Sequence, residues 1–403
     1  MSRIVLGITG GIAAYKAAEL TRLLVQARIT VDVVMTPAAC RFITPLTFQA
    51  LSGRLVHTDL WGATASNAME HINLSRGADA IVVAPASADF IAKLAHGHAD
   101  DLLSTLCSAR DIRMFVAPAM NRQMWNNPAN QRNVDLLRSD GIIVLGPDRG
   151  DQACGEIGEG RMMEPEAIVD AMMAATQPQL LAGMRVLLTA GPTFEAIDPV
   201  RGITNSSSGK MGYALARAAA EAGADVTMVS GPTGLATPAG VTRIDVRSAR
   251  QMADAVLRCV ADADVFVAVA AVGDYTPAQS APQKIKKGNA ALTLTLEPTL
   301  DILATIAARE NPPFCVGFAA ETEHVERYAT EKRSRKNVPL IVANRAQQAL
   351  QSDDNEVTLI DEAGAHPLPR MDKLTLARQL VAEIAMRMHA RATLDLPGTS
   401  RSV

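Results

Sequence analysis

Short uninterrupted apolar runs separated by amphipathic stretches make up the first half of the chain. Arg3–Gly7 is such a run, and Ala13–Gln26 then places Ala17, Leu20 and Leu24 on one helical face. Runs without polar alternation predict strands that are buried on both faces, which is typical of a parallel sheet covered by helices. The same pattern predicts further strands over Val31–Met35, Ala80–Ala84, Met114–Ala117 and Ile142–Leu145.

The pattern restarts after a segment that contains Pro and ends in Gly, and residues 176–183 are therefore the predicted linker. It separates a first domain, 1–175, from a second, 184–390, and we expect the tail 391–403 to be disordered. Both halves begin with a strand, a Gly-containing turn and a helix, which predicts two doubly wound, Rossmann-like α/β domains. In the second domain the predicted strands are Arg185–Thr189, Asp225–Val229, Val265–Ala270, Phe314–Phe318 and Leu340–Ala343, and the predicted helices are Gly209–Ala222, Ala249–Cys259, a basic helix before Leu340 and a closing helix near Leu374–Met388.

Composition favours a folded globular protein over a disordered, nucleic-acid-binding or membrane-spanning one. Hydrophobic residues make up 48% of the 403 positions, which suffices for two cores and argues against disorder. Lys and Arg number 39 against 42 Asp and Glu, so non-specific nucleic-acid binding is not expected and phosphate chemistry needs local clusters. The five cysteines form no CxxC pair, the N-terminus lacks a signal-peptide layout, and no run reaches the roughly 18 apolar residues of a membrane span. We therefore expect a cytoplasmic protein with small-molecule partners.

Two glycine- or serine-containing turns in the first half follow predicted strands. The turn Gly7–Gly11 opens a helix, where backbone N–H groups bind phosphate readily, although a plain tight turn fits it equally well. Ser87 follows the strand that starts at Ala80, at the edge where open α/β sheets bind ligands. Capping of the next helix explains Ser87 just as well.

Three further side chains in the first half carry candidate chemistry. His71 lies beside apolar residues, so a structural role and a role as base are both open. Asn121, in PAMNRQMW, offers an amide suited to a substrate carboxylate or amide, while Met120, Met124 and Trp125 around it could be core. Cys154, in ACGEIGEGRM, is the cysteine with the most polar surroundings, and three nearby glycines predict a mobile lid.

Together these strings resemble the flavin-dependent phosphopantothenoylcysteine decarboxylase family, over most of residues 3–165. The pair PAMNRQMW and ACGEIGEGRM is the specific part of the match, which also includes GGIAAYK, HINL and APASADFIAKLAHGHADDLLS. The resemblance implies that His71 acts as base, that Asn121 holds the substrate carboxylate or amide, and that Cys154 protonates and reduces the enethiol intermediate. It also implies FMN, bound by Gly10, Gly11, Ile12, Ala13, Thr36, Ser87 and Ala88.

The second half contains a serine- and glycine-rich turn and two lysine clusters. The string TNSSSGKMG is not a Walker A loop, because six residues separate Gly202 from Gly209 and Met211 follows Lys210. What remains is a helix start over Ser206–Gly212 that can bind an anion or simply cap the helix. Asp274 follows a strand and could bind a metal or a nucleotide hydroxyl, and the lysines of QKIKK and EKRSRKN are either solvated or close on a triphosphate.

This half resembles phosphopantothenate–cysteine ligase over about residues 184–362, through TAGPTFEAIDPVR, TNSSSGKMGYALA, AVAAVGDY, PQKIKK, VGFAAET, IVAN and DDNEVTLI. The resemblance implies CTP with Mg²⁺, an acyl-cytidylate intermediate held by Asn205, and amide formation with cysteine. The residues that it implies around CTP are Ala268, Val269, Ala270, Asp274, Lys284, Leu300, Asp301, Ile302, Leu303, Phe318, Lys332 and Lys336. Mg²⁺ is then bound mainly through the CTP phosphates.

Three positions depart from the ligase pattern. The family commonly has an aromatic residue at Gly202, Arg at Ser206 and Asp at Arg345. These departures bear on substrate affinity and on interfaces, whereas the lysines expected around CTP are present.

The two resemblances together predict a bifunctional enzyme of coenzyme A synthesis. Its ligase half would make 4′-phosphopantothenoylcysteine, which its decarboxylase half would convert to 4′-phosphopantetheine. An alternative is a flavin prenyltransferase-like domain fused to a nucleotide-binding domain, and another is a non-catalytic flavoprotein. The resemblance also implies a homo-oligomer in which the flavin domains form trimers and the ligase domains form dimers. A dodecamer is one assembly that contains both.

Overall fold

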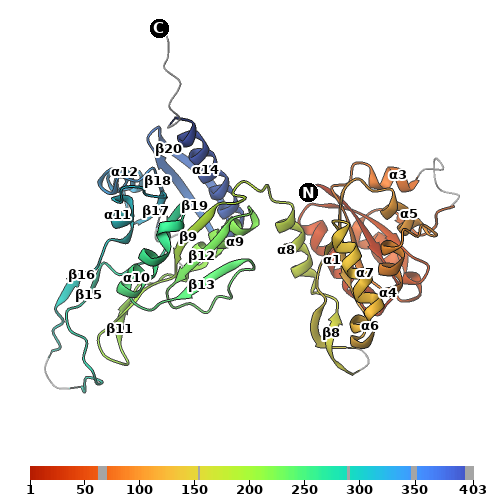
Figure 1. The fold of residues 1–403 in the computed structure, drawn as a ribbon, viewed down its shortest axis with the longest axis horizontal. Coiled ribbons are helices and arrows are strands. Elements are labelled where there is room, and N and C mark those ends of the chain that lie inside the picture. Colours follow the sequence, from red (N-terminus) through yellow and green to blue (C-terminus); the bar gives the residue numbers. More distant parts are fainter. Residues whose placement is uncertain (62–69, 153–154, 288–290, 346–351, 395–403) are drawn as a thin grey trace, which may run out of the picture. The chain divides into compact units, whose positions relative to one another are not determined.

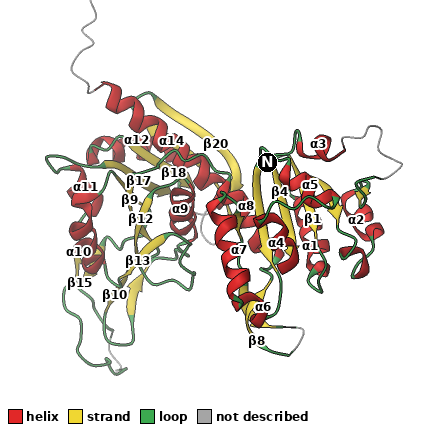
Figure 2. Cartoon of the chain, turned by 45° about the vertical axis from the view of Figure 1, so that its right-hand side comes forward, coloured by secondary structure: helices red, strands yellow, loops and turns green. Residues whose placement is uncertain are grey.

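The computed structural model describes residues 1–61, 70–152, 155–287, 291–345 and 352–394 (Figure 1). The chain divides into two compact units, Met1–Gln177 and Pro178–Val403. In each unit a central sheet is flanked by helices (Figure 2). Among the described residues no helix is long and apolar enough to cross a membrane.

The first unit is built on a six-stranded sheet that is parallel throughout, in the order β3-β2-β1-β4-β5-β6. Its strands are β1 (Arg3–Ile8), β2 (Thr30–Met35), β3 (Val56–His57), β4 (Ala80–Ala86), β5 (Arg113–Pro118) and β6 (Ile143–Val144). The predicted doubly wound fold is confirmed here, and the expected strands are present with ends shifted by up to two residues.

Helices cover both faces of this sheet because successive strand residues point to opposite sides. Leu6 packs with Leu20 of α1, whereas its neighbour Val5 packs with Phe90 of α4 in a separate cluster. The helices are α1 (Ala14–Gln26), α2 (Pro45–Ser52), α3 (Glu70–Ser75), α4 (Ala88–Ala95), α5 (Leu102–Ser108), α6 (Arg122–Asn126), α7 (Pro128–Ser139) and α8 (Pro165–Ala175), with a 3₁₀ turn at Ala39–Arg41.

The segment for which the glycines predict a mobile lid contains an antiparallel hairpin. Strand β7 (Asp148–Asp151) pairs with β8 (Ile157–Arg161), which takes in most of the glycine-rich string. Two residues at the turn, 153 and 154, lie outside the described part of the chain. Glycine permits both close packing of a regular strand and flexibility, so the mobile lid stays a prediction.

The second unit contains an eight-stranded mixed sheet in the order β13-β12-β9-β14-β17-β18-β19-β20. The first six strands in that order are parallel, and β19 and β20 add an antiparallel edge. The strands are β9 (Arg185–Ala190), β12 (Asp225–Ser230), β13 (Val241–Asp245), β14 (Val265–Ala268), β17 (Phe314–Glu321), β18 (Leu340–Arg345), β19 (Asp354–Asp361) and β20 (Gly364–Asp372). The pattern of apolar runs did not predict β13 or this edge, because these strands are more polar than the central ones.

The helices of the second unit also cover both faces of its sheet. Leu215 of α9 and Leu380 of α14 pack on one face, and Val256 of α10 and Ile306 of α11 pack on the other. The helices are α9 (Lys210–Glu221), α10 (Ala249–Cys259), α11 (Ile302–Ala307), α12 (Val325–Lys336) and α14 (Lys373–Leu394), with a 3₁₀ turn at Val260–Asp262. Two small hairpins, β10 (Phe194–Ala196) with β11 (Gly202–Thr204) and β15 (Tyr275–Pro277) with β16 (Leu296–Pro298), stand apart from the sheet.

The expected linker and the expected tail each contain residues that belong to the second unit's structure. Leu181 is buried in the second core and its N–H donates to the carbonyl of Ala222, so part of 176–183 belongs to the second unit. Helix α14 continues to Leu394, so residues 391–394 are helical rather than part of a disordered tail. The remaining tail, 395–403, lies outside the described residues.

Candidate functional sites

A cavity of about 640 Å³ lies at the carboxyl ends of β1, β4 and β5 in the first unit. It brings together most of the expected flavin-site residues, although they come from three distant segments. From the expected set, Gly10, Gly11, Ile12, Ala13, Ser87, Ala88 and Asn121 line it. Sequence reasoning did not include Tyr15, Lys16, Ala119, Asp151, Gln152, Gly160, Arg161 or Met162, which also line it.

The start of α1 fits a phosphate group at one end of this cavity. Its N-cap, Ala13, provides no side-chain hydrogen bond, and the N–H groups of residues 14–16 donate to the carbonyls of residues 11–13. A phosphate would therefore bind to the N–H groups of the turn before α1. A Cβ at Gly10 would lie 2.6 Å from the Cβ of Ala38, whereas Gly11 has no atom within 4 Å of such a Cβ. Gly10 is therefore required for packing, and Gly11 leaves the backbone open to a ligand.

Ser87 combines the two roles that the sequence leaves open. Its hydroxyl accepts a hydrogen bond from the N–H of Phe90 at 3.2 Å and so caps α4, and its own N–H donates to Oγ1 of Thr9 at 2.9 Å. It also lines the cavity. Capping and ligand contact are compatible at this position.

Asn121 is the N-cap of α6, and this use defines what its amide can offer a ligand. Its Oδ1 accepts a hydrogen bond from the N–H of Met124 at 2.8 Å. The Nδ2 donors remain, and donors suit a carboxylate. Of the neighbours that could be core, Trp125 is buried, whereas Met120 and Met124 line the cavity.

Of the three remaining residues expected in the flavin site, only Thr36 has a described side chain, and it does not line the cavity. Thr36 is buried after β2, where its Oγ1 accepts a hydrogen bond from the N–H of Ala39 at 3.2 Å. His71 lies in helix α3, and only its backbone is described. Cys154 lies outside the described residues.

Lys16 is a buried cation in the wall of this cavity. Its Nζ donates to the carbonyl of Met162 and to Oε1 of Glu164, both at 2.9 Å. The hydrogen bond from Lys16 holds the pKa of the Glu164 carboxyl below its usual range, and Arg161 contributes at 2.6 Å. This group joins α1 to the end of β8. The sequence signal was the Lys in GGIAAYK, although its partner lies 148 positions away.

A second cavity, of about 500 Å³, lies at the carboxyl ends of the parallel strands in the second unit. From the expected set it brings together Asn205, Val269, Ala270, Asp274, Phe318 and Lys332. The Nδ2 of Asn205 donates to the carbonyl of Ala271 at 2.9 Å. The helix start at Ser206–Gly212 lies in the wall, and the N-cap of α9, Gly209, adopts a left-handed conformation without a side-chain cap.

Three lysines make the wall of this second cavity cationic: Lys210, Lys332 and Lys373. Burial lowers the pKa of Lys332, and the nearby Lys336 ammonium lowers it further. Burial also lowers the pKa of Lys373, with a contribution from Lys210. An anionic ligand would relieve both effects, so this wall is suited to a phosphate chain. Lys373 was missed because it belongs to the β20–α14 junction, far along the chain from the other residues.

Several residues expected around CTP do not line this cavity. Ile302 and Leu303 are buried in the core, Leu300 is exposed, and Lys284 is exposed in the segment between β15 and β16. Ala268 also lies outside the lining.

Lys336 and Asp301 pair with each other next to this cavity. The Lys336 Nζ lies 2.9 Å from Asp301 Oδ1, and Asp301 also caps α11 through the N–H of Ala304. Burial alone would raise the pKa of Asp301, but the N–H of Ala304 and the Lys336 ammonium together hold it below its usual value. The pair is therefore ionic in the protein as described.

The segment that holds Lys284 is tied down at its neighbour Ile285. The N–H of Ile285 donates to Asp198 at 3.1 Å, and its carbonyl accepts from Arg201 at 2.6 Å. Arg201 in turn holds the pKa of Asp198 well below its usual range.

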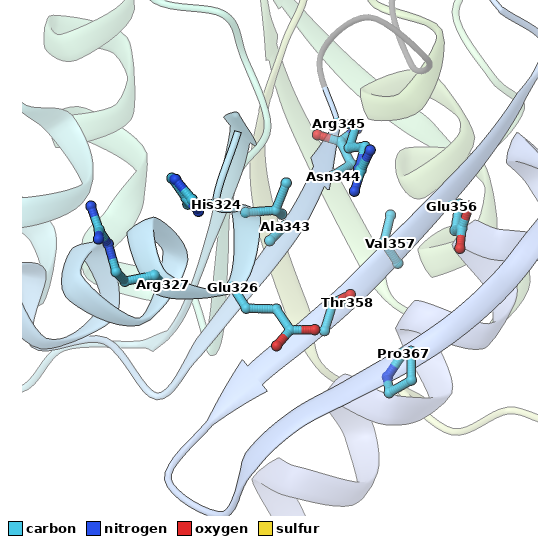
Figure 3. A pocket seen from close by; sticks show the side chains of 11 residues that line it. His324, Glu326, Arg327, Ala343, Asn344, Arg345, Glu356, Val357, Thr358 and Pro367 are labelled. Carbon is cyan, nitrogen blue, oxygen red and sulfur yellow. The ribbon is translucent and has the colours of Figure 1, made fainter. Parts of the chain in front are cut away.

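The three departures from the ligase pattern have different structural settings. Gly202 lies in β11 under the ring of Phe194, where a Cβ would be 2.4 Å from the ring Cζ, so this arrangement has no room for a second aromatic side chain. Arg345 lines a separate hollow of about 780 Å³ between the start of α12 and the β19–β20 hairpin (Figure 3). That hollow contains none of the residues expected to bind CTP. Ser206 lies in the wall of the second cavity.

No group of three or more His, Cys, Asp or Glu side chains able to hold a metal ion occurs among the described residues. A magnesium ion bound mainly through CTP phosphates would need no such group, so Mg²⁺ stays a prediction.

Comparison with known proteins assigns both units to families. Residues 1–177 match the flavoprotein family, and residues 181–388 match the family described as DNA/pantothenate metabolism flavoprotein C-terminal domain. The coenzyme A biosynthesis bifunctional protein CoaBC of Vibrio cholerae is 52% identical over 96% of this chain and 98% of its own length. The CoaBC proteins of Escherichia coli and Bacillus subtilis are 48% and 45% identical over 96% and 95% of this chain, and 97% and 96% of their own.

Solved structures with similarity match one unit at a time. The C-terminal domain of a CoaBC protein is 42% identical, with a TM-score of 0.46, over 53% of this chain and 99% of that domain. A phosphopantothenoylcysteine decarboxylase variant is 32% identical, with a TM-score of 0.38, over 43% of this chain and 96% of that chain.

Because relatives of this similarity match almost from end to end, the alternative of a prenyltransferase-like domain fused to an unrelated domain is not supported. The chain belongs to the family of coenzyme A biosynthesis bifunctional proteins.

Proposed function

We propose that the second unit joins 4′-phosphopantothenate to cysteine at the expense of CTP, and that the first unit decarboxylates the product to 4′-phosphopantetheine. The observation that carries the proposal is that motifs far apart in the sequence converge on two cavities of different chemistry. One has glycine, methionine and asparagine in its wall, and the other has three lysines and a serine-rich helix start.

In the ligase reaction, the lysines would stabilise the negative charge of the triphosphate. The carboxylate of 4′-phosphopantothenate attacks the α-phosphorus of CTP, so that an acyl-cytidylate forms and pyrophosphate leaves. Lys332 and Lys210 suit the leaving pyrophosphate, because ammonium groups stabilise charge that develops in the transition state. Asn205 would hold the intermediate until the cysteine amine attacks its carbonyl carbon and displaces CMP.

In the decarboxylase reaction, Asn121 would hold the substrate carboxylate through its Nδ2 donors, which its capping bond leaves available. FMN, when bound, supplies a reversible acceptor for two electrons from the substrate thiol. His71 would remove a proton from the substrate. Over the complete reaction one C–C bond breaks to release CO₂ and one C–H bond forms, and the two electrons return to the product. We assign the final proton to the Cys154 thiol.

The cavity in the first unit has features that support FMN. It places the uncapped start of α1, suited to a phosphate, beside the methionine side chains of Met120, Met124 and Met162, suited to a flat aromatic ring. Gly10, Gly11, Ile12, Ala13, Ser87 and Ala88 would contact the cofactor. Mg²⁺ would bind with CTP, and a homo-oligomer of flavin-unit trimers and ligase-unit dimers is part of the proposal.

The test is an assay of the full chain with 4′-phosphopantothenate, cysteine and one nucleoside triphosphate at a time. We expect yellow protein, pyrophosphate release with CTP, and then release of CO₂ and formation of 4′-phosphopantetheine. Colourless protein that stays colourless after refolding with excess FMN, together with no pyrophosphate release, would refute the proposal. Omission of Mg²⁺ should stop pyrophosphate release without affecting decarboxylation of added 4′-phosphopantothenoylcysteine.

A further inference from the structure

The β7–β8 hairpin holds the backbone on both sides of Asn121. The N–H of Met120 donates to the carbonyl of Gly160 at 2.9 Å, and the N–H of Arg122 donates to Oε1 of Gln152 at 3.0 Å. Asn121 therefore lies between two residues whose positions are set by hydrogen bonds from the hairpin.

Two glycines make this close approach possible. A Cβ at Gly160, where φ is +126°, would lie 2.5 Å from the carbonyl oxygen of Met120. A Cβ at Gly158 would lie 2.5 Å from Cδ of Arg122. Both distances are shorter than real Cβ contacts allow. At Gly160 the close atom belongs to the backbone, so glycine is needed there for the hairpin to dock on the Asn121 loop, whereas at Gly158 the exposed Arg122 side chain would have to move.

The Gln152 side chain uses both ends of its amide in this contact. Its Nε2 donates to the carbonyl of Glu159 at 2.9 Å, and this bond orients the amide so that its oxygen faces the N–H of Arg122. The backbone of Gln152 is fixed as well, since its N–H donates to the carbonyl of Glu156 at 2.8 Å. Gln152 thus links β8 to the first N–H of α6, next to the N-cap Asn121.

We propose that Gln152 is a positioning residue for substrate recognition in the first unit. It holds Arg122 and thereby keeps the Asn121 amide where its Nδ2 meets the carboxylate of the substrate. This inference rests on the proposed decarboxylase function, because it assumes that Asn121 binds that carboxylate. It follows that loss of Gln152 weakens the binding of ligands with the carboxylate and leaves ligands without it unaffected.

The test measures this preference with two unreactive probes on the flavin-loaded full chain. The first probe is 4′-phosphopantothenoylserine, in which a hydroxyl replaces the thiol, and the second is 4′-phosphopantothenoylethanolamine, which also lacks the carboxylate. Binding is followed through the flavin absorption spectrum, so that binding to the second unit does not contribute. In Gln152→Leu we expect the preference for the carboxylate probe to fall about three- to tenfold, the size expected for one hydrogen bond, with unchanged affinity for the second probe.

Gln152→Glu supplies a second, independent readout. Ionised glutamate keeps an acceptor for Arg122 but offers no donor to the carbonyl of Glu159, whereas protonated glutamate offers both. The preference should therefore recover as pH falls from about 7 to about 4, where glutamate with its ordinary pKa of about 4.3 becomes protonated, while that of the unmodified protein changes little. A preference that stays flat with pH in Gln152→Glu would contradict the proposal.

The matched control is Gln123→Leu, which removes another side-chain bond between the same two elements, from Nε2 to Oε1 of Glu156 at 2.9 Å. We expect it to keep the preference, and an equal loss there would assign the effect to docking of the whole hairpin. Equal weakening of both probes in Gln152→Leu would likewise overturn the proposal. Asn121→Ala separates the role of Asn121 from that of Gln152. If this variant keeps the preference for the carboxylate probe, Asn121 does not bind the carboxylate and the proposed decarboxylase role of Asn121 fails. If Asn121→Ala abolishes the preference but Gln152→Leu does not lower it, only the role of Gln152 fails.

Discussion

The two units use the same arrangement of six parallel strands to build cavities of opposite character. The order β3-β2-β1-β4-β5-β6 in the first unit matches β13-β12-β9-β14-β17-β18 in the second, and in both a helix without a side-chain cap follows the first strand of the unit. The cavity of the first unit contains methionines, Arg161 and one buried lysine paired with Glu164, whereas that of the second contains three lysines, of which Lys210 is paired with Asp353. Ligand chemistry therefore resides in the segments after the strands and not in the sheet.

The units also differ in what completes the cavity wall. In the first unit a hairpin folds back over the post-β5 loop through hydrogen bonds to its backbone. In the second unit, residues at the far end of the sheet close the wall: Asn344 of β18 donates to Asn355 of β19 at 3.3 Å, and Lys373 follows β20. The antiparallel edge strands thus have a function at the site as well as in the fold.

The largest expected effect isolates the first unit. Cys154→Ser should leave the protein yellow and reduce formation of 4′-phosphopantetheine by about 10³-fold, because a hydroxyl is a much weaker proton donor than a thiol. Product formation and flavin content measure this. Pyrophosphate release by the second unit serves as the control, and normal turnover by the variant would remove Cys154 from the mechanism.

The next largest effect is expected from a substitution that affects only the reaction of the second unit. Lys284→Gln should lower pyrophosphate release about 10²-fold and spare decarboxylation of added 4′-phosphopantothenoylcysteine. The prediction requires the exposed segment of Lys284, which does not line the second cavity, to reach the triphosphate when CTP binds, so that its charge stabilises the transition state. Lys286→Gln removes the same charge from the same segment and should have a much smaller effect, about threefold. Similar losses in both variants would mean that net charge matters rather than a specific ammonium, and loss of both activities would indicate a folding defect.

A pH experiment tests the cationic wall of the second unit. Burial lowers the pKa of Lys332, and a triphosphate binds the protonated form, so affinity should fall as pH rises through this lowered pKa. We expect CTP affinity, measured calorimetrically, to begin to fall at a lower pH than the titration of an ordinary lysine, whose pKa is about 10.4, would produce. Lys332→Arg keeps its charge and should flatten the profile. An unchanged profile in that variant would exclude Lys332 as the titrating group.

The smallest expected effect comes from a comparison of two N-cap serines, of which only one also lines a cavity. Ser87→Ala and Ser248→Ala each remove the N-cap of a helix, α4 or α10, and should each lower stability by about 1 kcal/mol. Only Ser87 lines the first cavity, so only Ser87→Ala should also weaken FMN binding. Thermal unfolding and flavin titration measure the two quantities, and equal flavin affinity in both variants would limit Ser87 to capping.

Apolar runs were sufficient to predict the central strands of both units, because a strand buried on both faces must be apolar throughout. Of the covering helices, the sequence predicted α1 in the first unit and α9, α10, α12 and α14 in the second. The apolar runs failed for β7, β8, β19 and β20, which are polar or glycine-rich and are held by pairing with a neighbouring strand. Motifs likewise indicated Gly10, Ser87, Asn121 and the lysine clusters as site residues. They did not indicate Lys373 or Gln152.

Local sequence thus determined the strand–turn–helix units, their buried faces and the chemical types of the candidate groups, because these depend on residues close together in the chain. Only the tertiary structure decided which groups share a cavity. It joined Lys16 to Glu164, placed Lys373 beside Lys210, and buried Ile302 and Leu303 in the core, away from the cavity. The reason is physical: such contacts depend on how strands distant in sequence are ordered in the sheet, and side-chain spacing along the chain carries no record of that order.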